Sequence, residues 1–128
     1  MKALLVIALF YTAASLLHFT HNAEFLADYP NLPASFTRVG VYGAWLAVTA
    51  IGALGYAMLR IGWKVAGLLL LAAYAAFGLD GLAHYSLAPF SAHTGMMNFT
   101  ILFEVAMALL LLGVVGRGLV AINRERHS

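Results

Sequence analysis

Four long apolar stretches, separated by short polar segments, make up nearly the whole chain. Their apolar cores cover about residues 3–19, 39–59, 65–87 and 96–119. Each core approaches or exceeds the roughly 20 apolar residues that a membrane-spanning helix needs. Signals for helix ends extend the cores to predicted spans of about 3–27, 36–59, 64–87 and 95–119. The pattern predicts one all-α domain, an integral membrane four-helix bundle with no extramembrane module.

The segments between the spans contain the residues that end and begin helices. Two prolines in the segment 28–33 end the first helix, and Ser35 or Thr37 is a candidate cap for the second. The other connections, 60–64 and 88–95, are short. Short connections favour antiparallel neighbours, so we expect an up-down-up-down bundle.

Composition and charge place this bundle in a membrane. The chain is 63% hydrophobic and 9% charged, against about 25% charged residues in soluble domains. Six of the seven basic residues fall at the N-terminus, in the second loop or at the C-terminus: Lys2, Arg60, Lys64, Arg117, Arg124 and Arg126. The positive-inside rule then predicts that both termini are cytoplasmic, in a multi-pass protein of the inner (plasma) membrane. Basic residues spread singly do not indicate nucleic-acid binding.

The few ionisable side chains within the spans lie toward the periplasmic or exterior side. At 1.5 Å per residue, His18 and Asp80 lie about 24 Å above Lys2 and Lys64, and Glu104 lies about 20 Å above Arg117. His21, His84 and Asn98 form a second tier about 4–9 Å further out. Charged groups inside a membrane are costly and mark functional sites. We therefore expect one outward-facing site.

The residue types in this site are those that hold transition metals in helix bundles. We expect His18, His21, Asp80 and His84 to be metal ligands. His93 is a further candidate ligand, and Glu104 is a candidate catalytic base or a partner of a ligating imidazole. Tyr42 and Asn98 are candidate cofactor-binding donors. The chain has no cysteine, so nitrogen and oxygen would hold the ion. Zinc, copper and iron fit this set, and the sequence does not choose among them.

One part of this set resembles a known metal-binding run. Asp80, His84 and His93 are similar in type to the copper-binding Asp, His, His run in the membrane subunit of particulate methane and ammonia monooxygenases. The second gap is shorter in this chain, and the remaining sequence does not match. The resemblance implies copper as one candidate metal and no particular activity.

Three function classes follow, in order of preference. The first is a metal-dependent membrane enzyme, a hydrolase or an oxidoreductase, acting on a lipid or small apolar substrate. The second is electron transfer with haem b or a quinone, using His18 or His21 against His84. The third is transport of metal ions or protons. The expected partners are membrane lipid and the substrate, and four spans could form a homo-oligomer or one subunit of a membrane complex.

The candidate site residues also have ordinary structural explanations. His21, Asn22 and Glu24 could lie in the headgroup region, where polar groups cost little. His93 could be a solvent-exposed loop residue. A purely structural pair, Asp80 with His18 or Glu104 with His84, could fix the helix register.

Overall fold

The computed structural model describes residues 1–128 and is all-helical, with four helices long and apolar enough to span a membrane. The third of these spans is not one continuous α-helix. In chain order the elements are α1 (Lys2–Glu24), η1 (Leu26–Asp28), α2 (Arg38–Arg60), α3 (Lys64–Phe77), η2 (Gly78–Ala83), α4 (His84–Leu87), η3 (Phe90–Ala92) and α5 (Gly95–His127). The elements labelled η are short 3₁₀ helices.

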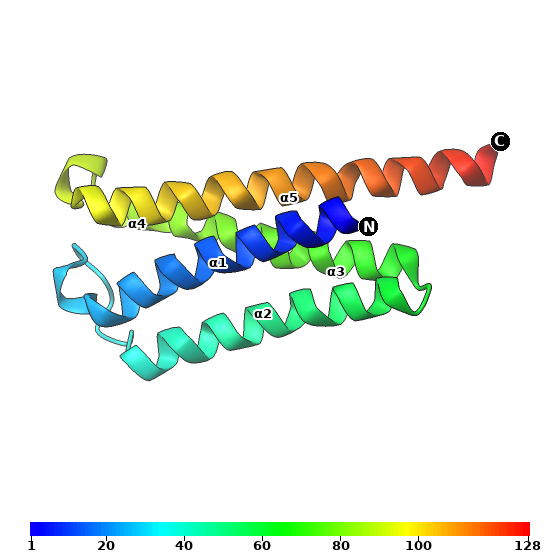
Figure 1. Cartoon of the computed structure of the whole chain (residues 1–128). Helices are drawn as coiled ribbons and strands as arrows, with labels where there is room; N and C mark the ends of the chain where they lie inside the picture. The colour runs from blue at the N-terminus through cyan, green and yellow to red at the C-terminus, as the bar shows by residue number, and fades with distance from the viewer.

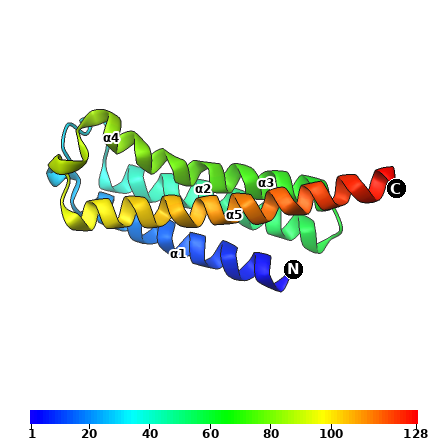
Figure 2. The same ribbon diagram turned by 90° about the horizontal axis from the view of Figure 1, so that it is seen from above.

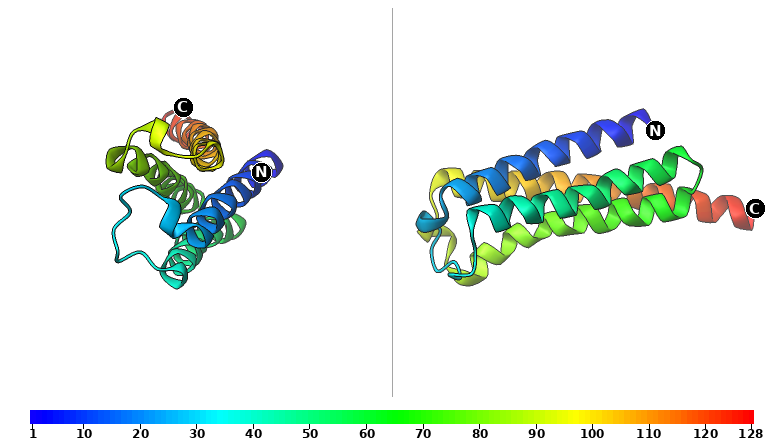
Figure 3. Two further views of the ribbon diagram at one scale, coloured as in Figure 1. Left: turned by 90° about the vertical axis from the view of Figure 1, so that its left-hand side faces the viewer. Right: turned by 90° about the horizontal axis from the view of Figure 1, so that it is seen from below.

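The helices form a square in which each long helix has two neighbours. α1 packs against α2 and α5, and α3 packs against the same two helices. Figure 2 shows α5 running between α1 and α3, and the end-on view in Figure 3 shows all four corners. Both chain termini lie at one end of the bundle (Figure 1). The connections 25–37 and 88–94 lie at the other.

Helix ends differ from the sequence prediction by a few residues. α1 ends at Glu24 and not near 27, because the chain passes into the 3₁₀ turn of η1 before Pro30. α2 begins at Arg38, where the Thr37 hydroxyl accepts a hydrogen bond from the amide of Gly40 at 3.0 Å. α5 continues to His127 and not 119. Basic side chains in its last turn are favourable beside the carbonyl end of the helix dipole.

α2 and α3 touch most closely near the turn that joins them. A Cβ atom added at Gly67 would stand 2.7 Å from the carbonyl oxygen of Gly55, so the two backbones are in direct contact. Small residues at such positions let membrane helices approach. Toward the other end α2 and the α3–α4 segment move apart (Figures 1 and 3). α2 and the third span are therefore in close contact near their connecting turn and farther apart near the long loops.

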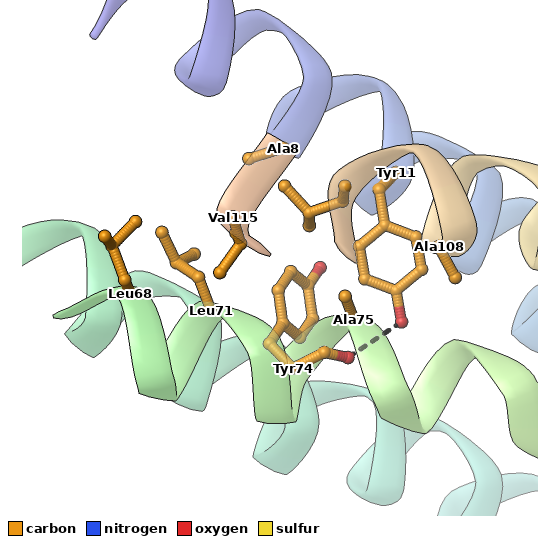
Figure 4. Close-up of a cluster of buried hydrophobic side chains, with 9 residues drawn as sticks. Ala8, Tyr11, Leu68, Leu71, Tyr74, Ala75, Ala108 and Val115 are labelled. Atoms are coloured by element: carbon orange, nitrogen blue, oxygen red, sulfur yellow. Dashed lines mark hydrogen bonds between the residues drawn. The ribbon is translucent and has the colours of Figure 1, made fainter. Parts of the chain in front are cut away.

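The interruption of the third span is the feature that the sequence pattern did not predict. At the end of α3 the amide of Gly78 donates to the carbonyl of Ala75, so the Tyr74 carbonyl loses its usual helical partner. The hydroxyl of Tyr11 donates to that Tyr74 carbonyl at 3.0 Å, as the dashed line in Figure 4 shows. Both tyrosines are buried with Leu71 in the apolar core. A side chain of α1 thereby satisfies a backbone group that has no access to water in the membrane.

Glycine is required where the interruption begins. A Cβ atom at Gly78 would stand 2.6 Å from the hydroxyl of Tyr11 and 2.8 Å from the Cβ of Ala108. We predict that Gly78→Ala lowers the stability of the purified protein by about 1–3 kcal/mol, because the methyl group overpacks this contact. Thermal unfolding in detergent measures the change.

Gly113→Ala is the matched control, since nothing lies within 4 Å of a Cβ atom at Gly113 in α5. Equal melting temperatures for the Gly78 and Gly113 variants would contradict the packing argument.

Candidate functional site

A pocket of about 560 Å³ lies between the separated helices at the end opposite the termini. Its walls come from α1, the segment before α2, α2 itself and the α3–η2–α4 span, and α5 contributes one residue. The polar side chains that line it include His18, Asn22, Asp80, His84 and Glu104. Phe19, Phe36 and Phe77 are among its apolar lining residues.

The most deeply buried part of the pocket is formed by His18 of α1 and Glu104 of α5. Their side chains are 5% and 1% exposed, and His18 Nε2 lies 3.8 Å from Glu104 Oε2. A Cβ atom at Gly81 would stand 3.5 Å from the same glutamate oxygen and 3.7 Å from the imidazole nitrogen. Because Gly81 has no side chain, η2 leaves space beside this pair.

The contact with Thr100 indicates the tautomer of His18. The hydroxyl of Thr100 donates to the carbonyl of Met97 at 3.1 Å, so it acts as an acceptor toward His18 Nδ1 at 3.4 Å. His18 Nδ1 therefore carries a hydrogen, and Nε2 faces the carboxylate. The pair is electrically neutral overall when one further proton sits on either Nε2 or the glutamate, which lie 3.8 Å apart. Either group can carry it.

His84 and Asn22 form a second buried pair beside the first. Asn22 Nδ2 lies 3.0 Å from His84 Nε2, and an amide nitrogen can only donate, so this imidazole nitrogen accepts. The rings of His18 and His84 are 5.5 Å apart in an edge-to-face arrangement. Two buried oxygens, Glu104 Oε1 and Asn22 Oδ1, have no hydrogen-bond partner. Both belong to residues that line the pocket.

His21, Glu24 and Tyr42 make side-chain hydrogen bonds at the loop between α1 and α2. His21 Nδ1 lies 2.9 Å from the hydroxyl of Tyr29, and burial raises the pKa of Tyr29 to about 12, so this phenol keeps its proton at neutral pH. Glu24 accepts hydrogen bonds from Arg38 and from Tyr42, each at 2.8 Å. Neither His21 nor Tyr42 lines the pocket.

His93 and Asn98 organise the connection between α4 and α5. His93 Nδ1 donates to the carbonyl of Pro89 at 3.0 Å. The amide of Asn98 donates to the carbonyl of Phe90 at 3.2 Å and accepts from the hydroxyl of Tyr85 at 2.8 Å. His93 is buried and not solvent exposed. Neither residue lines the pocket, although the rings of His93 and His84 are 6.2 Å apart.

The structure thus brings together part of the predicted metal set. His18, Asp80, His84 and Glu104 share one pocket, whereas His21 and His93 contact loop residues. No group of three or more His, Cys, Asp or Glu side chains is close enough to hold a metal ion. The metal and the ligand role of these residues stay predictions from the sequence.

Sequence reasoning did not single out Thr100, which orients His18. Thr100 lies four residues before Glu104, so the two side chains share one face of α5. This spacing was a usable signal. Asn22 was considered as a headgroup residue, but it is buried in the pocket wall.

The chain was also compared with known proteins. No family model matches it, and no curated protein or solved structure matches it either.

We predict that His18 and Glu104 are energetically coupled. Removing one partner leaves a buried polar group unpaired, so His18→Leu and Glu104→Leu should each be strongly destabilising, and the double variant should cost less than their sum by about 1–3 kcal/mol. Unfolding of the four proteins in the same detergent measures this coupling. Additive effects would show that the two side chains do not act as a pair.

Proposed function

We propose that the chain is an up-down-up-down membrane bundle with both termini in the cytoplasm and its pocket facing the periplasm or exterior. The support is the distribution of basic residues, six of which lie toward the end that carries the termini. Only Arg38 lies at the pocket end, where it is paired with Glu24. A bundle oriented this way follows the positive-inside rule.

Within this bundle we propose that the pocket binds a small, mostly apolar molecule, either a lipid or a small apolar substrate. Ligand sites are concave, of about 300–1,000 Å³, and mostly apolar with a few converging polar groups. The pocket of about 560 Å³ has these properties. The observation that carries the proposal is the unpartnered oxygen of Glu104, which is buried in the base of this pocket.

The chemistry that this site supports is acid–base catalysis on the bound molecule. His18 and Glu104 are neighbouring buried groups that can each carry a proton, and a pair of this kind can give or take a proton at the pocket base. Glu104 is then the catalytic group of the proposal. His18 sets its charge, and Thr100 fixes the ring of His18.

The transition metal predicted from the sequence would have its ligands in the same pocket. His18, Asp80, His84 and Glu104 are of the types that zinc, copper and iron take. Bound there, the metal would supply Lewis-acid chemistry, or redox chemistry with copper or iron. The hydrolase and oxidoreductase interpretations both depend on it.

Haem b receives less support from the geometry. Nε2 of His18 faces Glu104, and Nε2 of His84 accepts from Asn22. Both Nε2 atoms therefore face polar groups of this chain. Transport would need polar residues through the second half of the bundle, where the core around Leu111 and Val115 is apolar.

We predict that a neutral amphipathic probe, 4-phenylbutanol, binds the purified protein and that Ala44→Trp weakens its binding at least tenfold. Ala44 lines the pocket from α2, so an indole there would fill it. Isothermal titration in lipid nanodiscs, with protein-free nanodiscs subtracted, measures the dissociation constant. Ala50→Trp is the matched control, because Ala50 is exposed on the same helix but does not line the pocket.

Binding that is equal in both tryptophan variants would place the probe outside the pocket and refute the proposed site. Elemental analysis of the same protein tests the metal. Stoichiometric zinc, copper or iron that is lost in Asp80→Asn and kept in His127→Ala would favour the metal-dependent enzyme.

A further inference from the structure

Three acidic side chains lie within or at the ends of the spans around the pocket, and one of them has no partner. Glu24 is paired with Arg38, and Glu104 is paired with His18. Asp80 lines the pocket from η2 and makes no hydrogen bond or ion pair within the chain. A carboxylate within a membrane span is costly unless something offsets its charge.

The pocket contains no residue with a permanent positive charge. None of its 17 lining residues is Lys or Arg. The His18–Glu104 pair is balanced, and His84 Nε2 accepts from Asn22, so the carboxylate of Asp80 sets the net charge of the pocket. An anionic ligand group, such as a phosphate or a carboxylate, would find no lysine or arginine to pair with there.

Two buried oxygens in the pocket wall have no hydrogen-bond partner. Glu104 is 1% exposed and Asn22 is 6% exposed, and each has a buried oxygen without a partner. A ligand whose polar end donates hydrogen bonds would satisfy these two oxygens.

The apolar walls also favour a cation. Phe19, Phe36 and Phe77 line the pocket from three different segments. Phenylalanine faces attract a positive charge within about 6 Å of the ring centre, most strongly where water is excluded. Aromatic walls and a carboxylate together are suited to an ammonium group.

We propose that the pocket selects small apolar molecules whose polar end is a protonated amine, held by Asp80 and by the free oxygens of Glu104 and Asn22. This inference rests on the proposed function and names the ligand class. The ligand is a free amine and not an aminophospholipid. The amine of such a lipid lies beside a phosphate, and the pocket has no lysine or arginine to pair with that phosphate.

Three probes share a 4-phenylbutyl tail and differ in the charge of the polar end: 4-phenylbutylamine, 4-phenylbutanol and 5-phenylpentanoate. We predict that the amine binds at least tenfold more tightly than the alcohol and that the acid binds least. Isothermal titration in phosphatidylcholine nanodiscs, with protein-free nanodiscs subtracted, measures the three dissociation constants. Replacing half of the lipid with phosphatidylethanolamine should leave the amine constant unchanged, and competition by that lipid would overturn the free amine as the occupant.

Asp80→Asn should weaken amine binding at least tenfold and leave alcohol binding within about twofold, because only the charge is removed. Asp28→Asn is the matched control, since Asp28 lies in η1 and does not line the pocket. Acid binding as tight as amine binding, or an Asp80→Asn variant with full amine affinity, would overturn the inference. If 4-phenylbutanol still binds in that case, and Ala44→Trp still blocks its binding, the proposed function stands without the preference for amines. Failure of all three probes to bind would overturn both.

Discussion

The hydrogen bond from the hydroxyl of Tyr11 to the carbonyl of Tyr74 is the contact on which the site depends. A membrane-spanning helix cannot leave a backbone carbonyl unpaired without a large cost. Tyr11 meets that requirement from a neighbouring helix, and Gly78 gives its ring room to do so. The third span can therefore change from α to 3₁₀ geometry halfway across its length. That change brings Gly81 against Glu104 and puts Asp80 in the wall of a pocket.

The mouth of the pocket depends on a different set of contacts, all of them polar. Glu24 ties the end of α1 to the start of α2 through Arg38. Asn31 adopts a left-handed backbone conformation, with φ of 57°, and its side chain donates to the carbonyl of Leu87 at 2.9 Å. Asparagine accepts this conformation more readily than most residues. The loop that carries Phe36 is thus anchored on both sides of the pocket, so helices that diverge still form a defined cavity.

The sequence predicted the four apolar helices well, because span length and apolar content follow directly from membrane thickness. It also predicted that His18 and Glu104 lie at one depth, since both stand on regular helices where the rise per residue is constant. It could not predict which side chains of the outer tier turn inward. His21 contacts Tyr29 and His93 contacts Pro89, and these partners lie in irregular loops whose course no periodicity describes. The 3₁₀ segment was missed for a related reason, because the carbonyl that it frees is satisfied from another helix.

The three acidic side chains near the pocket differ in whether the chain supplies a partner for them. Glu24 has an arginine, and Glu104 has a histidine that is itself held by Thr100. The same chain therefore neutralises two carboxylates and leaves a third, Asp80, without a partner. Nothing in the packing of η2 requires an acid at that position, because Asp80 is exposed and makes no ion pair with a basic group. An acid that lines the pocket and has no partner within the chain is the group that we propose meets the ligand.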